Sequence, residues 1–165
     1  MILLSIGSNL GNKYDNIKRC ISLISKFSQV KKKSFFYRSP SYPNKNYPKF
    51  INLVIQIEYK GDPNSLLKRL KLVEKRIGRL KKIKNAPRVC DIDIIDYNGF
   101  IIENETLSIP HSNMHKRNFV LYPLKDIAPN WLHPKLNKNV DFLKNELNRV
   151  SHIEITRIKE SDINK

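Results

Sequence analysis

Cysteine is scarce in this sequence, which has two cysteines among 165 residues. Two are too few to cross-link a domain of this size, and they are not spaced as a metal-binding pair. Cys20 falls on the face of a predicted helix and Cys90 at a predicted strand. We therefore expect two buried free thiols in a reducing compartment, and not a disulfide-stabilised secreted scaffold.

Long apolar runs are missing as well. Residues 1–6 are too short a run, and lack the basic flank, for a signal peptide. No apolar segment approaches the roughly 20 residues that are needed to cross a bilayer. We predict a cytoplasmic protein with no membrane contact. It should fold as a single domain over residues 1–165, with the last few residues frayed.

Acidic residues are few, with 15 Asp and Glu against 31 Lys and Arg and a formal net charge of +16. Such an excess predicts an anionic partner, which could be nucleic acid, a membrane surface or a phosphate-rich small molecule. The sequence is also rich in Lys, Asn and Ile, as an AT-rich genome favours. Biased base composition is therefore an alternative source of many lysines, spread over solvated faces.

The spacing of apolar residues and turn formers predicts the order of secondary structure. Strands are expected at 2–8, 30–37, 50–59, within 87–95 and at 153–158, and helices at 13–27, 62–80 and 140–148. A loop with three prolines covers 38–48, and Asn98-Gly99 favours a type I′ turn that returns into residues 100–102. This order predicts an α+β fold, a ferredoxin-like sandwich in which helices pack on the faces of an antiparallel-rich sheet.

Two acidic residues stand close together in the strand within 87–95. Asp91 and Asp93 alternate with apolar residues, so both project from one face, with Cα atoms about 7 Å apart. Mg²⁺ favours one or two carboxylates plus phosphate and water. Arg88, which follows the stiff Pro87, adds a planar guanidinium suited to phosphate. An amphipathic strand whose polar face carries two acids is the alternative that this motif alone leaves open.

A second polar cluster lies in the segment 109–121. His111, Met114, His115 and Arg117 precede an apolar run and are expected to form a short helical turn. A zinc site would need more ligands than two histidines, and no cysteine or suitable carboxylate motif accompanies them. Donors for an anion explain the histidines and the arginine better, although an ordinary surface turn also fits.

Two further features each have two explanations. The turn at 7–12 lacks the ending of a Walker phosphate loop and the full glycine pattern of a dinucleotide site, so a plain strand–helix connection is favoured. Asn52 lies among apolar residues in an alternating strand, near Phe50. It is either a core amide satisfied by the backbone or an amide that contacts a ligand.

Taken in order, these segments resemble the 6-hydroxymethyl-7,8-dihydropterin pyrophosphokinase family of the folate pathway. The resemblance covers nearly the whole chain, and its motifs are weak singly and highly specific together. They are Gly7-Ser8-Asn9-Leu10-Gly11, Phe36-Tyr37-Arg38-Ser39-Pro40, Phe50-Ile51-Asn52, Glu74 to Gly78-Arg79, Pro87-Arg88-Val89-Cys90-Asp91-Ile92-Asp93, and Pro110-His111 with Met114, Arg117, Phe119 and Val120.

The resemblance implies a monomer that moves pyrophosphate from ATP to a pterin alcohol and releases AMP. It implies that two Mg²⁺ ions are held by Asp91 and Asp93. It assigns catalytic roles to Asp91, Asp93, Arg79, Arg88 and Arg117. The implied ATP-binding residues are Lys71, Glu74, Arg79, Lys81, Arg88, Ile94, Ser108, His111, Ser112 and Arg117. The implied pterin-binding residues are Ser39, Pro40, Tyr42, Phe50, Asn52 and Phe119. The loops 41–49 and 81–85 resemble lids that close over the substrates and exclude water.

Three positions depart from the common family pattern. Asn85 stands where an aromatic residue is usual, Thr106 where an arginine is frequent, and Ser112 where an aromatic residue often follows the histidine. These departures bear on lid closure and nucleotide affinity, and not on the kind of reaction.

A basic ferredoxin-like module that binds nucleic acid is the alternative from another class, because the net charge suits a phosphate backbone. The sheet lacks the aromatic signature of RNA-binding sheets, and the paired aspartates would repel a polyanion. A metal-dependent nuclease fits less well still, since Phe50, Asn52 and Phe119 would have no role in it. We therefore expect small-molecule substrates and no nucleic acid.

Overall fold

A sheet in which every strand pairing is antiparallel forms the centre of the molecule. The structure, a computed structural model, describes residues 1–79, 86–150 and 154–162. In these residues the strand order is β5-β1-β4-β3-β8, and β2 also pairs with β4. The strands are β1 (Ile2–Ser8), β2 (Gln29–Lys33), β3 (Phe36–Ser39), β4 (Phe50–Glu58), β5 (Asp91–Tyr97) and β8 (Thr156–Ile158), with a separate small pair, β6 (Ile102–Glu103) and β7 (Ser108–Ile109).

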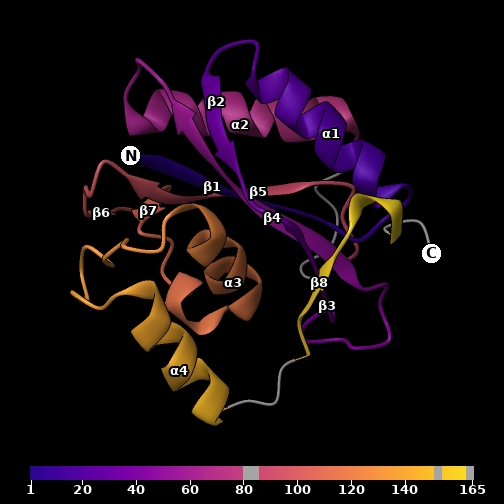
Figure 1. Ribbon diagram of the computed structural model, residues 1–165. Coiled ribbons are helices and arrows are strands. Elements are labelled where there is room, and N and C mark those ends of the chain that lie inside the picture. The colour runs from indigo at the N-terminus through magenta and orange to yellow at the C-terminus, as the bar shows by residue number, and fades with distance from the viewer. Residues whose placement is uncertain (80–85, 151–153, 163–165) are drawn as a thin grey trace.

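Helices cover both faces of this sheet (Figure 1). The helices are α1 (Lys13–Ile24), α2 (Pro63–Ile77), α3 (Asn118–Ile127) and α4 (Val140–Val150), with short 3-10 turns η1 (Met114–Lys116) and η2 (Glu160–Asp162). One hydrophobic core lies between the sheet and the pair α1 and α2, and a second lies between the sheet, α3 and α4. The predicted α+β sandwich with helices on the faces of an antiparallel-rich sheet is confirmed.

Alternation along the strands divides their side chains between the two cores. On β1, Leu4 and Ile6 pack under α1 and α2, whereas Leu3 packs under α3. On β4, Leu53 and its alternate neighbours join the first core and Val54 joins the second. The central strands are therefore buried on both sides.

Helix α2 begins as predicted but ends at Ile77, before the predicted residue 80. Asp62 caps it by accepting hydrogen bonds from the backbone of Asn64 and Ser65, and Pro63 occupies the first turn. Its C-cap is Gly78, whose φ of 102° is in the left-handed region that glycine adopts without strain. Its apolar stripe is buried as expected from Leu66 to Ile77, and Leu80 lies outside the described residues.

Three further predicted boundaries in the first half are wrong. The helix expected over 13–27 ends at Ile24, where the hydroxyls of Ser25 and Ser28 bond back to main-chain carbonyls and compete with the helix. The strand expected over 30–37 is two strands, β2 and β3. They separate at Ser34, whose hydroxyl accepts a bond from the amide of Val54. Residues 38 and 39, expected in the proline loop, belong to β3.

The second half differs from expectation in two places. Asn98 and Gly99 form the predicted left-handed turn, with φ of 54° and 74°. The returning residues do not pair with β5, because β6 pairs with β7 instead. Helix α3 was expected only as an apolar run punctuated by prolines. Pro123 lies inside it, and burial of its apolar residues against the sheet offsets the missing backbone bond.

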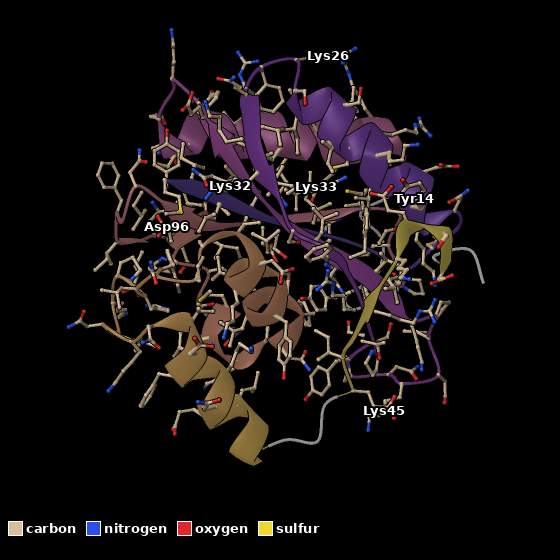
Figure 2. All side chains as sticks on the ribbon, viewed as in Figure 1. Tyr14, Lys26, Lys32, Lys33, Lys45 and Asp96 are labelled. Carbon is tan, nitrogen blue, oxygen red and sulfur yellow. The ribbon has the colours of Figure 1, made fainter. Side chains whose placement is uncertain are left out.

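The C-terminal segment returns to the edge of the sheet. Strand β8 pairs with β3, and the hydroxyl of Tyr14 (labelled in Figure 2) donates to Glu160 of η2 at 2.7 Å. Strand β8 is shorter than the predicted 153–158, whose first residue lies outside the described residues. The last few residues were expected to fray, and residues 163–165 lie outside the described ranges.

Several expectations from composition can be compared with the structure. Cys20 and Cys90 are buried and free, as predicted. Lys26 and Lys45 are exposed and project outward (Figure 2), consistent with part of the net charge lying on solvated faces. Over residues 1–79, 86–150 and 154–162, none of the helices has the length and apolar character required of a membrane span.

Candidate functional site

Two cross-strand rows form the floor of the candidate site. In the first row Gly7 of β1 lies opposite Asn52 of β4 and Asp91 of β5, and in the second Ser5 lies opposite Val54 and Asp93. Residues directly opposite in antiparallel strands share a face of the sheet. Both rows therefore face the side of the sheet that α3 covers.

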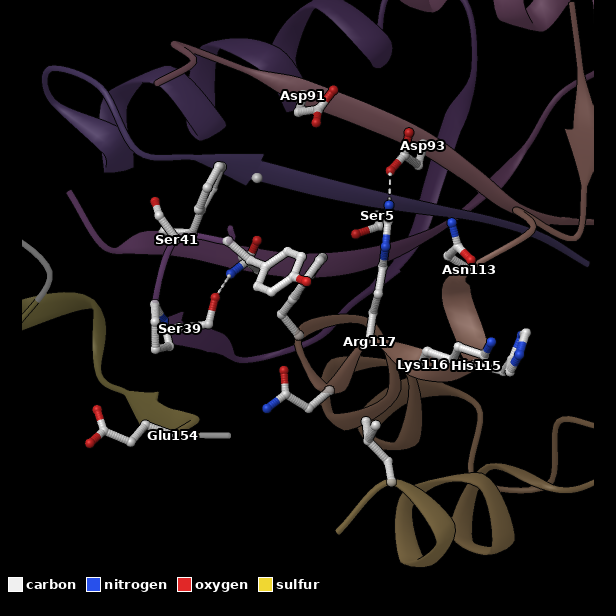
Figure 3. Close-up of a pocket in the computed structure, with 18 of the residues that line it drawn as sticks. Ser5, Ser39, Ser41, Asp91, Asp93, Asn113, His115, Lys116, Arg117 and Glu154 are labelled. Carbon is white, nitrogen blue, oxygen red and sulfur yellow. Dashed lines mark hydrogen bonds and ion pairs between the residues drawn. The ribbon is translucent and has the colours of Figure 1, made fainter. Parts of the chain in front are cut away.

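Above this floor lies a cavity of about 1440 Å³. Its walls come from the proline loop, from the turn η1 and the start of α3, and from α4 (Figure 3). The expected site residues that line it are Ser39, Pro40, Tyr42, Phe50, Asn52, Arg88, Asp91, Asp93, Arg117 and Phe119. Every predicted pterin residue and both predicted metal ligands thus meet around one space.

Two guanidinium groups hold the carboxylate of Asp91. Arg79 Nη1 lies 2.7 Å from Asp91 Oδ1, and Arg88 Nη1 lies 2.5 Å from Asp91 Oδ2. Arg88 is positioned by Asn9, whose side-chain oxygen accepts from the Arg88 amide at 2.6 Å. The buried side chain of Asn9 also donates to Ser41 Oγ and to the Pro48 carbonyl, and so connects this arginine to the proline loop.

The role of Asn9 is not apparent from the sequence. Its side chain joins the first turn, the proline loop and the segment before β5. A polar side chain inside a glycine-containing turn was the available signal, but the distant partners were not visible in the sequence.

Asp93 lies beside Arg117 and His111. Arg117 Nη1 lies 3.3 Å from Asp93 Oδ2, and His111 Nε2 lies 3.9 Å from the same oxygen (Figure 3 shows the arginine). Burial, followed by the negative charge of Asp91, raises the pKa of Asp93, and His111 and Arg117 oppose the shift. The two aspartates therefore repel each other across a partly desolvated space.

The ring of His111 lies beside the carboxylate of Asp93. Burial lowers its pKa despite the nearby charge of Asp93. The amide of Asn113 donates to His111 Nδ1 at 3.2 Å, and His111 Nε2 lies 3.3 Å from Arg117 Nη1 and 3.9 Å from Asp93 Oδ2.

Glu74 of α2 contacts β5 through a hydrogen bond to its backbone. Its side chain is 4% exposed, and Oε1 accepts from the amide of Ile92, which lies between the two aspartates, at 2.8 Å. The same carboxylate pairs with Arg79 and, at 3.0 Å, with Lys71. Glu74 thus links α2 to the carboxylate strand.

The pterin-side residues form one connected group. Asn52 Nδ2 donates to the buried hydroxyl of Ser39 at 3.0 Å (Figure 3), and Phe50 and Phe119 line the same cavity. The Arg117 guanidinium lies 5.7 Å from the Phe119 ring centroid. Asn52 borders the cavity and bonds to a side chain, and contact of its amide with a ligand stays a prediction.

The structure does not bring every predicted ATP residue to the cavity wall. The predicted residues that do not line it are Lys71, Glu74, Arg79, Ile94, Ser108, His111 and Ser112. Ile94 packs in the core and Ser112 is exposed. Lys81, with the rest of the segment 80–85 and the Asn85 departure, lies outside the described residues. Their roles toward ATP stay predictions.

The paired carboxylates suit a hard divalent cation. Asp91 and Asp93 offer oxygen ligands, and a cation between them would relieve the repulsion that contributes to the raised pKa of Asp93. In the described part of the chain, no cluster of three or more His, Cys, Asp or Glu residues forms a fuller cage. Water and phosphate would complete the coordination, as Mg²⁺ prefers.

A tyrosine anchors α3 beside the cavity. The Tyr37 hydroxyl contacts both carboxylate oxygens of Asp126 at 3.0 and 3.1 Å, which ties α3 to β3. Burial, and then the charge of Asp126, raises the pKa of Tyr37. The native state keeps the phenol proton at a pH where the unfolded chain, with a pKa near 10, has lost it. Unfolding free energy therefore falls as pH rises above about 10.

We expect Tyr37→Phe to be less stable than the parent by about 2 kcal/mol at pH 7, since it loses a bond to a charged acceptor. Above pH 10 this difference should shrink, because only the parent pays for keeping its phenol protonated. Urea unfolding of both proteins at pH 7 and pH 10.5 measures it. A difference that stays constant or widens would contradict the prediction.

In this α+β fold, two carboxylates on the sheet face guanidinium groups beside a large cavity. This arrangement is typical of metal-dependent enzymes that act on phosphates. The family model for 7,8-dihydro-6-hydroxymethylpterin-pyrophosphokinase (HPPK) matches residues 3–129. The chain belongs to this family.

Named relatives agree with the family match. The chain is 35% identical over 145 residues to the Aquifex aeolicus 2-amino-4-hydroxy-6-hydroxymethyldihydropteridine pyrophosphokinase, covering 88% of this chain and 91% of that protein. It is 40% identical over 144 residues to the Folic acid synthesis protein FOL1 of Dictyostelium discoideum, covering 87% of this chain and 22% of that protein. The chain thus spans about nine tenths of the Aquifex aeolicus protein and about a fifth of the Dictyostelium discoideum protein.

The fold has solved counterparts. A crystal structure of a Plasmodium falciparum HPPK-DHPS variant superposes with a TM-score of 0.74 at 17% identity, covering 95% of this chain and 47% of that chain. At that identity the likeness concerns the fold alone. None of these comparisons supports the nucleic-acid-binding alternative.

Proposed function

We propose that this chain transfers pyrophosphate from ATP to the hydroxymethyl group of 6-hydroxymethyl-7,8-dihydropterin and releases AMP, a step in folate synthesis. The observation that carries the proposal is the single cavity that joins all six predicted pterin residues to both predicted metal ligands. Family membership and the near full-length Aquifex aeolicus relative support it.

The pterin would lie at the proline-loop end of the cavity. Phe50 and Phe119 are aromatic residues of its lining, and offset stacking on them is worth about 0.5–1.5 kcal/mol beyond burial. Asn52, held by Ser39, would pair with the amide-like edge of the pterin ring. Pro40 and Tyr42 would border the ring from the loop.

The triphosphate would lie at the arginine end. Arg88 and Arg117 line the cavity and are paired with Asp91 and Asp93 in this state. A bound triphosphate would compete for the guanidiniums and so free the carboxylates for two Mg²⁺ ions. Those ions, when bound, would neutralise phosphate charge and acidify the attacking hydroxyl. Lys71, Arg79, His111 and the other predicted ATP residues would complete this end.

The reaction requires little covalent chemistry from the protein. The pterin hydroxyl oxygen bonds to the β-phosphorus of ATP, and the bond from that phosphorus to the oxygen shared with the α-phosphorus breaks. AMP leaves with that oxygen. Arg88 and Arg117 stabilise the charge that develops, and Asp93 is our candidate to accept the hydroxyl proton. Catalysis is then positioning and charge stabilisation.

An AMP-release assay tests the proposal directly. With ATP, Mg²⁺ and the reduced pterin alcohol, we expect one AMP for each pterin consumed, and no AMP when pterin is omitted or EDTA is added. Formation of ADP instead, or AMP release that is independent of pterin, would contradict the proposed reaction.

We further propose that the chain acts as a monomer in the cytoplasm. Two buried free thiols suit a reducing compartment, and a monomer is what the family resemblance implies. Size-exclusion chromatography with light scattering tests the oligomeric state.

A further inference from the structure

Gly7 occupies the centre of the cavity floor. It lies on β1 between Asn52 on one neighbouring strand and Asp91 on the other. Along the same face of β1 the side chains become smaller toward the cavity, from Leu3 in the core to Ser5 and then Gly7, both of which line it. The strand therefore presents its least bulky residue between the pterin end and the carboxylate end.

The conformation of Gly7 does not explain why glycine stands there. The glycines with left-handed φ are Gly11, Gly78 and Gly99, and Gly7 is not among them. Any residue could adopt its backbone angles. The reason must lie in the space above its Cα.

The side chain of Asn52 fills that space. A Cβ atom placed on Gly7 would lie 2.8 Å from Asn52 Oδ1 and 3.5 Å from Phe50 Cδ1. Real Cβ atoms essentially never come within 3.0 Å of another heavy atom, so the amide would have to move. Its other end is fixed, because Asn52 Nδ2 donates to the buried Ser39 hydroxyl at 3.0 Å. The amide is therefore positioned by Ser39 at one end and by the absence of a side chain at Gly7 at the other.

We propose that Gly7 is a specificity-determining residue for the pterin, because it leaves room for the Asn52 amide in the orientation that recognises the pterin ring edge. This inference rests on the proposed function. With a methyl group at position 7, Asn52 either breaks its bond to Ser39 or tilts into the space of the pterin. Both outcomes weaken recognition of the ring edge and leave the arginine end of the cavity unchanged.

Gly7→Ala tests the proposal. We expect the Kd for the pterin, measured by calorimetry with a saturating non-hydrolysable ATP analogue and Mg²⁺, to rise on the order of tenfold, the effect of one lost hydrogen bond. The Kd for the ATP analogue alone should stay within twofold of the parent value. An unchanged pterin Kd would overturn the inference, and so would equal losses for pterin and ATP analogue.

A double-mutant cycle provides the matched control. Asn52→Ala removes the atoms that the new Cβ would meet, and should itself weaken pterin binding. Adding Gly7→Ala to that variant should then change the pterin Kd by less than twofold. A further tenfold loss in that background would overturn the inference, because the methyl group would be acting without Asn52.

Two results separate this inference from other causes. If Gly7→Ala is too unstable to assay, recovery of the Asn52→Ala melting temperature in the double variant supports the contact, and unfolding in both backgrounds overturns it. If the parent turns over pterin while Gly7→Ala binds it equally well, the proposed function stands and the role of Gly7 fails. If the parent binds no pterin, both fail.

Discussion

Asp91→Asn and Asp93→Asn are each expected to lower AMP release by about 10³-fold, the loss of roughly 4 kcal/mol of transition-state stabilisation. Each change removes one of the two negatively charged carboxylates of β5 that line the cavity. The asparagine amide that replaces the carboxylate is neutral and is a poor ligand for a hard cation. It also offers no negative charge to the neighbouring arginines. Steady-state assays over a range of Mg²⁺ concentration measure the loss.

The fold should survive both substitutions. Asp91 and Asp93 are 24% and 29% exposed at the side chain, and Asn keeps their shape. Asp93→Asn also removes a carboxylate whose ionisation the site disfavours. Circular dichroism and thermal melting should match the parent closely. The loss of activity would then be chemical and not structural.

Asp141→Asn is the matched control. Asp141 lies on α4, is paired with Lys125, and does not line the cavity. It should retain parental AMP release. Near-parental turnover in both Asp91→Asn and Asp93→Asn would remove the metal assignment, and an equal loss in Asp141→Asn would show that the assay reports folding.

The sequence was sufficient to predict the sheet and the carboxylate strand for physical reasons. Strand β1 is a short apolar run, β4 alternates clearly, and α2 has a capping aspartate and a first-turn proline. These signals act over a few residues and need no tertiary context. The same-face placement of Asp91 and Asp93 follows from strand geometry alone.

Other features depend on contacts between distant segments. Helix α3 contains Pro123, and its burial against the sheet offsets the backbone bond that proline lacks. The division of 30–37 into two strands depends on a bond between Ser34 and Val54. The crowding of Gly7 by Asn52 depends on strand register, which pattern alone does not fix. The contribution of α4 to the cavity wall lies beyond the residues that the family model matches.

Glu74→Ala is expected to lower the free energy of unfolding by about 3 kcal/mol, because it leaves buried polar groups without their partner. The amide of Ile92 would lose its acceptor, and Arg79 would lose one of its two carboxylates. Since Ile92 lies between the metal-site aspartates, AMP release should fall as well. Urea unfolding measures the first effect, and the pyrophosphoryl-transfer assay the second.

Two control variants distinguish this role from a direct contact with ATP. Glu74→Gln keeps an oxygen that can accept from Ile92, so it should lose less stability than Glu74→Ala. Glu58→Ala removes an exposed acid paired with Lys31 and should cost less than about 1 kcal/mol. If Glu74 served only to bind nucleotide, Glu74→Ala would unfold like the parent and lose ATP affinity alone. Loss of stability without bound ATP would instead establish Glu74 as the link that holds the carboxylate strand against α2.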